Sequence, residues 1–214
     1  MDPNERLYNA VRESKLEDVK NLLDSGVNPN IENTQGKTPL YWAAFNKNDK
    51  IVKLLLNKGA DPNRADMEGI SPLYWAAYTK NNKILELLLA KGADPNIEDE
   101  EGKTPLYWAA FTGNSEATKI LLQYGANPNK PDIKGDTPLS IAEKFNKKNI
   151  VKLINKRMRT MGPVESLYSV LGNNSPFIHD NKLVRDLHEY ARSEGGKRRT
   201  IKKKSNKRQS RIKK

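Results

Sequence analysis

The sequence predicts an all-α repeat solenoid, because one motif returns along it at a fixed spacing. The stretch Thr38–Ala44 recurs as Ser71–Ala77, with serine in place of threonine, and unchanged as Thr104–Ala110. The prolines at 39, 72, 105 and 138 are 33 residues apart, and the glycines at 36, 69, 102 and 135 keep the same step. A period of this length is typical of stacked supersecondary units that bury their apolar faces against one another.

Each unit is predicted to hold two helices. The first begins at the proline, after a threonine or serine whose hydroxyl caps the first turn. These first helices are expected over 39–46, 72–79 and 105–112. A second helix follows an asparagine at 48, 81 or 114, and its apolar residues recur at helical spacing. Its expected capping residues are Asp49, Asn82 and Ser115, and a glycine at 59, 92 or 125 ends it.

The repeated residues resemble the ankyrin repeat family, whose T-P-L-H-x-A-A and G-A-D-x-N signatures appear here as TPLYWAA and GADPN. The resemblance covers about residues 5–158 and implies an ankyrin repeat domain over 1–158. Within it we expect an N-terminal capping repeat over 4–31, full repeats over 32–64, 65–97 and 98–130, and a C-terminal capping repeat over 131–158.

Beyond the repeats the period is lost. Short helices expected over 164–171 and 181–193 make up a helical extension over 159–194. Residues 195–214 include 11 Lys or Arg and no acidic residue, so we predict a disordered basic tail there. The rest of the chain has 27 basic and 26 acidic residues, so the tail carries 11 of the 12 units of net positive charge.

The aromatic residues of the motif depart from the family pattern. The family's usual histidine is tyrosine at 41, 74 and 107 and serine at 140, and the next residue is tryptophan at 42, 75 and 108. Two interpretations of the tryptophans stay open. They widen the core between repeats, or they present their edges to a binding partner.

The sequence offers little for catalysis. It has no cysteine, and its two histidines, His179 and His188, lie outside the repeats without the spacing of metal ligands. Gly36-Lys37-Thr38 resembles the end of a phosphate-binding P-loop, but Ile31 stands where that motif needs a glycine. We therefore expect no enzyme, no cofactor and no metal site.

The N-terminal stretch lacks the apolar segment of a signal peptide, and no run approaches the roughly 20 apolar residues that span a bilayer. We expect an intracellular protein, cytoplasmic or nuclear, that has no membrane span and is a monomer.

The resemblance implies protein binding, because partners of ankyrin repeats usually lie against the hairpin tips and inner helices of the concave face. At the tips it places Thr34, Gln35, Lys37, Met67, Glu68, Ile70, Glu100, Glu101 and Lys103. At the ends of the inner helices it places Phe45, Asn46, Tyr78, Thr79, Phe111 and Thr112. Phe45, Tyr78 and Phe111 form an aromatic ladder that is either packing between helices or an exposed docking stripe.

The expected function is non-catalytic binding of an unidentified protein partner. The chain could also be an adaptor that acts on host proteins, as ankyrin proteins of large DNA viruses and intracellular bacteria often do.

The alternative is a nucleic-acid-associated or nuclear protein whose tail binds nucleic acid or carries an import signal. A further interpretation is that the tail only improves solubility or contacts anionic lipid headgroups. Its cations are Lys197, Arg198, Arg199, Lys202, Lys203, Lys204, Lys207 and Arg208.

Overall fold

The computed structural model describes residues 2–160 of the chain. These residues form ten α-helices and no strand, which confirms the predicted all-α repeat architecture. The chain divides into two compact units, Met1–Lys156 and Arg157–Lys214, and only Arg157–Thr160 of the second unit is described. The extension predicted over 159–194 lies outside the described residues except for its first two, and the predicted tail lies wholly outside them.

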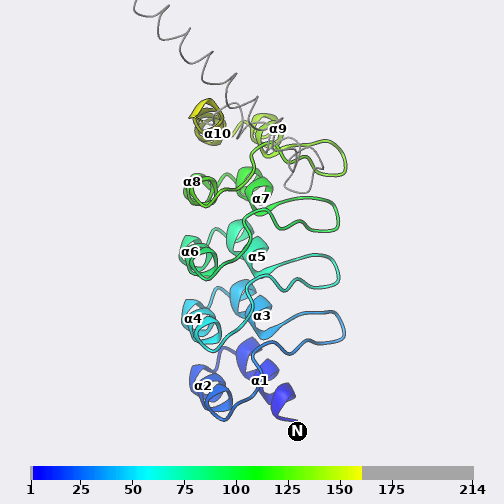
Figure 1. Ribbon diagram of the computed structural model, residues 1–214, viewed down its shortest axis with the longest axis vertical. Coiled ribbons are helices and arrows are strands. Elements are labelled where there is room, and N and C mark those ends of the chain that lie inside the picture. Colours follow the sequence, from blue (N-terminus) through cyan, green and yellow to red (C-terminus); the bar gives the residue numbers. More distant parts are fainter. Residues whose placement is uncertain (1, 161–214) are drawn as a thin grey trace, which may run out of the picture. The chain divides into compact units, whose positions relative to one another are not determined.

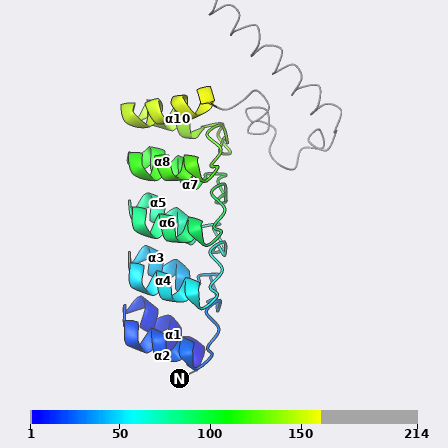
Figure 2. The same ribbon diagram turned by 60° about the vertical axis from the view of Figure 1, so that its left-hand side comes forward.

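The helices pair and stack in chain order (Figure 1). Helices α1, α3, α5, α7 and α9 form an inner row, and α2, α4, α6, α8 and α10 form an outer row (Figures 1 and 2). Hairpin-shaped loops extend from the inner row, away from the outer helices. The inner helices are α1 (Pro3–Arg12), α3 (Pro39–Phe45), α5 (Pro72–Tyr78), α7 (Pro105–Thr112) and α9 (Pro138–Lys144). The outer helices are α2 (Leu16–Asp24), α4 (Asp49–Asn57), α6 (Asn82–Ala90), α8 (Ser115–Gln123) and α10 (Lys148–Thr160).

The inner helices begin as the sequence predicts. Thr38 is the N-cap of α3, and its hydroxyl oxygen accepts a 3.1 Å hydrogen bond from the Tyr41 N–H. The equivalent N-caps are Ser71, Thr104 and Thr137. In α9 the serine in the tyrosine position has a structural role, because Ser140 Oγ also accepts a bond from the Thr137 N–H and completes a capping box.

The predicted caps of the outer helices are wrong by one residue. Asn48 is the N-cap of α4 and accepts a bond from the Ile51 N–H, whereas Asp49 is the first helical residue. The other N-caps are Asn81 and Asn114, in place of Asn82 and Ser115. The asparagine amide oxygen reaches the free N–H of the third helical residue, which a side chain already inside the helix does not reach.

The core lies between the two rows of helices and consists mainly of aliphatic side chains. Leu40 and Leu73 of the inner row and Leu55 and Leu88 of the outer row are at most 1% exposed. Every repeat contributes such residues, so each repeat between the two ends of the stack is packed on both sides by its neighbours.

The hairpin loops are also joined to one another. In the second loop the Asp66 side chain accepts bonds from the backbone N–H groups of Glu68 and Ile70, which fixes the turn. The Met67 N–H then donates to the Gln35 carbonyl of the preceding loop at 3.0 Å. Equivalent bonds join Glu100 to Glu68 at 3.1 Å and Ile133 to Glu101 at 2.9 Å. The tips therefore form one hydrogen-bonded edge along the stack.

Asparagines join the repeats at the opposite end of the loops. Asn63 Nδ2 donates to the Gly92 carbonyl at 3.0 Å, and Asn63 Oδ1 accepts from the Asp94 N–H at 2.7 Å. Asn30 and Asn96 make the same pair of bonds to their own next repeats. Each loop is thus tied to its neighbour at its tip and at its base.

Candidate functional site

A continuous column of aromatic rings runs through the inner row of helices. Trp75 shows how it is built, since its ring packs edge-on against Tyr41 and Phe45 of the preceding repeat, with centroids 5.8 and 4.7 Å away. The same ring contacts Tyr74 and Tyr78 of its own repeat at 5.0 and 6.1 Å. One tryptophan therefore connects four rings of two repeats.

The other tryptophans repeat this arrangement. Trp42 meets Tyr8 of α1 at 6.3 Å, and Trp108 meets Tyr74 and Tyr78 at 5.0 and 5.6 Å. We call the connected rings the aromatic column: Tyr8, Tyr41, Trp42, Phe45, Tyr74, Trp75, Tyr78, Tyr107, Trp108, Phe111 and Phe145. The tryptophans thus pack between adjacent repeats, as the first interpretation of them expects. A binding role for their edges stays a prediction.

The three indole N–H groups lie in different polar surroundings. The Trp42 N–H donates to the Tyr8 hydroxyl, and the Trp108 N–H donates to Asp99 Oδ2 at 3.1 Å. Within the described part of the chain, the buried Nε1 of Trp75 forms no hydrogen bond of regular geometry, although the Tyr41 hydroxyl lies near enough to interact with it. Asp132 Oδ2 is likewise buried without a partner there. Asp132 occupies the same repeat position as Asp99. Ile141 stands at the repeat position of Trp108, so Asp132 has no indole N–H to accept from there.

The aromatic ladder combines the two alternatives that the sequence left open. Phe45 and Tyr78 pack against Trp75 and Trp108 of the following repeats, yet they remain 41% and 40% exposed. Phe111 is half-buried because Phe145 packs on it at 4.9 Å. The ladder is therefore held by packing on one side and open to solvent on the other.

Phe145 was missed in the sequence because it does not follow the register of the ladder. It lies 33 residues after Thr112, whereas the residue 33 after Phe111 is Lys144. Phe145 is 43% exposed and ends the column at the C-terminus of α9. An aromatic residue at the end of the last inner helix was the signal that could have identified it.

The other predicted residues at the ends of the inner helices are engaged within the fold. Asn46 is exposed, and its amide donates to the Arg12 carbonyl at 3.0 Å. Thr79 and Thr112 are half-buried, and their hydroxyls donate to the carbonyls of Trp75 and Trp108 at 2.7 and 2.9 Å.

The loop tips present six of the predicted residues to solvent: Thr34, Gln35, Met67, Glu68, Glu100 and Glu101. Met67 is the most open of the predicted apolar residues, at 69%. Ile133 holds the equivalent tip position of the last loop and is 70% exposed. The sequence reasoning missed it because it did not extend the tip positions into the last loop, which precedes α9.

Lys37, Ile70 and Lys103 are half-buried at the inner end of the loops. The Lys103 ammonium lies over the rings of Tyr107 and Trp108, 5.5 and 5.1 Å from their centroids. Lys37 covers Tyr41 and Trp42 in the same way. The middle repeat has Ile70 at this position, so no lysine from this position covers the rings of Tyr74 and Trp75.

Burial changes the acidity of the column's phenols. Desolvation raises the pKa of Tyr41 to about 12 against the opposing effect of the neighbouring Trp75 N–H, and the nearby carboxylate of Asp66 acts in the same direction as desolvation. Desolvation also raises the pKa of Tyr74 to about 12, with Tyr78 and Asp99 adding to the effect. These hydroxyls stay protonated at neutral pH and serve only as neutral hydrogen-bonding groups.

No group of His, Cys, Asp and Glu residues within 2–160 is arranged to hold a metal ion. No helix in that part of the chain is long and apolar enough to cross a membrane. His179, His188 and the predicted basic residues between 197 and 208 lie outside the described residues.

Comparison with known sequences agrees with the repeat architecture. The family model for ankyrin repeats (3 copies) matches residues 7–99 and 91–160. A comparison with curated proteins gives no match. Ankyrin repeats are generally protein–protein interaction modules and typically non-catalytic. Because the matched residues cover more than half of the sequence and coincide with the stacked helix pairs, the chain belongs to the ankyrin repeat family.

Proposed function

We propose that this protein binds a partner protein on the face formed by the inner helices and the loop tips. The observation that carries the proposal is the exposure of Phe45 and Tyr78, which keep about two-fifths of their surface open while Trp75 and Trp108 hold them in place. Aromatic residues of this kind are over-represented among the residues that dominate binding energy.

The fold supports binding because the surface is already ordered. The tips are linked by backbone hydrogen bonds and the rings by edge-on contacts, so little conformational entropy is lost when a partner docks. Met67 and Ile133 add apolar side chains at the tips that are exposed at 69% and 70%. The exposed acidic side chains of Glu68 and Glu100 accompany them and would favour a partner with basic residues around an apolar centre.

The N-terminal end of the column offers an additional recess. A pocket of about 310 Å³ lies there, lined by Asn9, Arg12, Glu13, Trp42 and Asn46. The Arg12 guanidinium stacks over Trp42, 5.0 Å from the ring centroid. The recess could receive one side chain of a partner that runs along the ladder.

The test is a quantitative capture of proteins from cell extract with three forms of the chain. These are the wild type, the double variant Phe45→Ala/Tyr78→Ala, and Tyr124→Ala. Tyr124 is a matched control because it is 47% exposed but lies against the outer helices α6 and α8. A partner that is lost with the double variant and retained with Tyr124→Ala supports the proposal. Equal capture by all three forms contradicts it, provided that thermal unfolding shows the variants to be folded.

An adaptor role would require a second surface beyond the repeats. The extension predicted over 159–194 is the segment that we expect to provide it. This role stays a prediction, as do an intracellular location, a monomeric state and the tail's role in nucleic-acid binding or nuclear import.

A further inference from the structure

Helix α10 differs in charge from every other outer helix. Its residues Lys148–Thr160 include three lysines and two arginines and no carboxylate. The helices α2, α4, α6 and α8 each contain at least one acidic residue. The two charged residues closest to the start of the helix, Lys144 and Lys147, are also basic.

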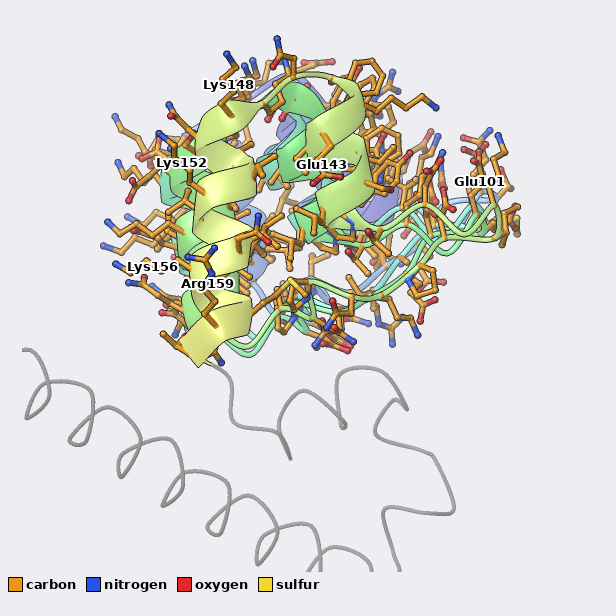
Figure 3. All side chains as sticks on the ribbon, turned by 90° about the horizontal axis from the view of Figure 1, so that it is seen from above. Glu101, Glu143, Lys148, Lys152, Lys156 and Arg159 are labelled. Atoms are coloured by element: carbon orange, nitrogen blue, oxygen red, sulfur yellow. The ribbon has the colours of Figure 1, made fainter. Side chains whose placement is uncertain are left out.

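Three of these lysines form a row along the helix. Lys148, Lys152 and Lys156 are exposed and four residues apart, and Figure 3 shows them spaced along the length of α10. Ile150 and Ile154 are at most 1% exposed and hold the other side of the helix in the core. This anchoring fixes the orientation of the helix, so the lysine row faces solvent.

The lysine row has no partner in the described part of the chain. Elsewhere on the outer helices lysines meet carboxylates, as Lys58 meets Asp24 at 2.7 Å and Lys83 meets Asp49. Among residues 2–160, none of Lys148, Lys152 and Lys156 forms an ion pair.

Solubility of the end of the stack does not account for this charge. A capping repeat needs a polar outer surface, which both signs of charge provide equally well. The N-terminal capping repeat illustrates this, because α2 carries Glu17, Asp18 and Asp24 beside Lys20. The C-terminal capping repeat has only positive charge on its outer helix, which indicates a negatively charged partner.

We propose that the lysine row of α10 binds the phosphate backbone of a nucleic acid. No large apolar side chain of α10 is among the exposed ones, so the surface lacks both the anchors of a protein hot spot and the apolar face of a membrane-inserting helix. The helical rise puts successive lysines about 6 Å apart along α10, and one strand of a duplex carries a phosphate about every 3.4 Å along its axis, so a row of this length can lie against several phosphates. A rigid row of cations at this spacing gains affinity by releasing counterions without ordering itself first.

This site is distinct from the proposed protein-binding face, and the two proposals fail independently. The sequence adds a second cationic segment, since residues 195–214 hold 11 Lys or Arg and no acidic residue. The test therefore keeps the full chain and changes only the helix, so that any contribution of the tail is the same in every form.

The experiment measures binding of the full chain to duplex DNA of about 20 base pairs and to a single-stranded RNA over a range of salt concentrations. The test variant is Lys148→Gln/Lys152→Gln/Lys156→Gln. The matched control is Lys20→Gln/Lys53→Gln/Lys91→Gln, which removes the same charge from exposed positions of the outer surface. A third form, Lys148→Arg/Lys152→Arg/Lys156→Arg, keeps the positive charge.

We expect the test variant to lose affinity by at least about tenfold at low salt, and its slope of log K against log salt to fall by about two to three. The control and the arginine form should bind at least one of the nucleic acids like the wild type. Equal losses in the test and control variants overturn the proposal. Binding to phosphatidylserine vesicles or to polyglutamate that exceeds binding to nucleic acid, and depends on the same lysines, also overturns it.

Discussion

Phe45 packs edge-on against Trp75 of the following repeat, with ring centroids 4.7 Å apart and an interplanar angle of 84°. Because the contact crosses from one repeat to the next, it stabilises the stack rather than a single unit. We expect a double-mutant cycle with Phe45→Leu and Trp75→Leu to give a coupling energy of about 0.5–1.5 kcal/mol in urea unfolding. The pair Tyr124→Leu and Trp75→Leu should be additive. Equal coupling in the two cycles would show that the ring contact contributes nothing specific.

The repeat core predicts unequal costs for the same substitution at adjacent leucines. Leu55 and Leu88 are fully buried, so Leu55→Ala and Leu88→Ala should each lower the free energy of unfolding by about 2–5 kcal/mol. Their neighbours Leu54 and Leu87 are half-buried, and their replacement by alanine should cost clearly less. Chemical denaturation measures both, and equal losses would contradict the register of the outer helices.

Two glycines with similar backbone angles should respond differently to an added methyl group. Gly69 has φ of +74°, and a Cβ there would lie 2.7 Å from the Cα of Asp99 in the next loop. Gly59 has φ of +86°, but a Cβ would meet nothing within 4 Å. Gly59→Ala should therefore cost about 1–2 kcal/mol, from backbone strain alone. Gly69→Ala should cost more because the loops must also separate, and a smaller loss at Gly69 in thermal unfolding would refute the close contact.

Two substitutions at Asp132 can separate the contribution of its hydrogen bonds to stability from the contribution of its charge. Its Oδ1 accepts bonds from the N–H groups of Lys134 and Asp136 at 2.9 and 2.8 Å, while its Oδ2 is buried without a partner in the described residues. Asp132→Ala leaves two N–H groups unpaired and should cost about 1–3 kcal/mol. Asp132→Asn keeps the acceptor, as Asn33 does in the first loop, and should unfold at or above the wild-type urea midpoint. An asparagine variant as unstable as the alanine variant would mean that Oδ2 has a stabilising partner.

The buried phenols predict a loss of stability at alkaline pH. The pKa of Tyr41 and of Tyr74 is about 12 in the folded chain, against about 10 for an unfolded tyrosine. Between these values the unfolded state binds fewer protons than the folded state, so stability falls as pH rises. The contribution is fully present below about pH 10 and is lost as pH rises through about 12. Urea midpoints should fall less steeply in this window for Tyr41→Phe/Tyr74→Phe, and parallel curves would contradict the assignment.

The sequence predicted the stack because its signals are local and repeated. The N-caps of the inner helices, such as Thr38, depend on residues within one turn, and the structure confirms them. The cap of α4 was missed by one residue because Asn48 and Asp49 have nearly the same capping chemistry. Only the path of the chain decides which side chain faces the free N–H groups.

The aromatic column was harder to predict because it depends on distances between repeats. The sequence shows Trp42, Trp75 and Trp108 at equal spacing, but it does not show which rings of the preceding repeat each one meets. Phe145 joins the column from outside the ladder register, because it is the residue after the last inner helix and Lys144 occupies the ladder position. The sequence shows that Lys148, Lys152 and Lys156 are four residues apart, but their lack of carboxylate neighbours required the structure.

The unequal surroundings of the three indoles have a spectroscopic consequence. Trp42 donates to a phenol, Trp108 donates to a carboxylate, and the buried Trp75 N–H lies near the Tyr41 phenol without forming a regular hydrogen bond among the described residues. Indole fluorescence responds to such differences, so chains that keep one tryptophan each should emit differently and report separately on the N-terminal, middle and C-terminal repeats. The protein thus carries intrinsic reporters that can reveal at which end of the array unfolding starts.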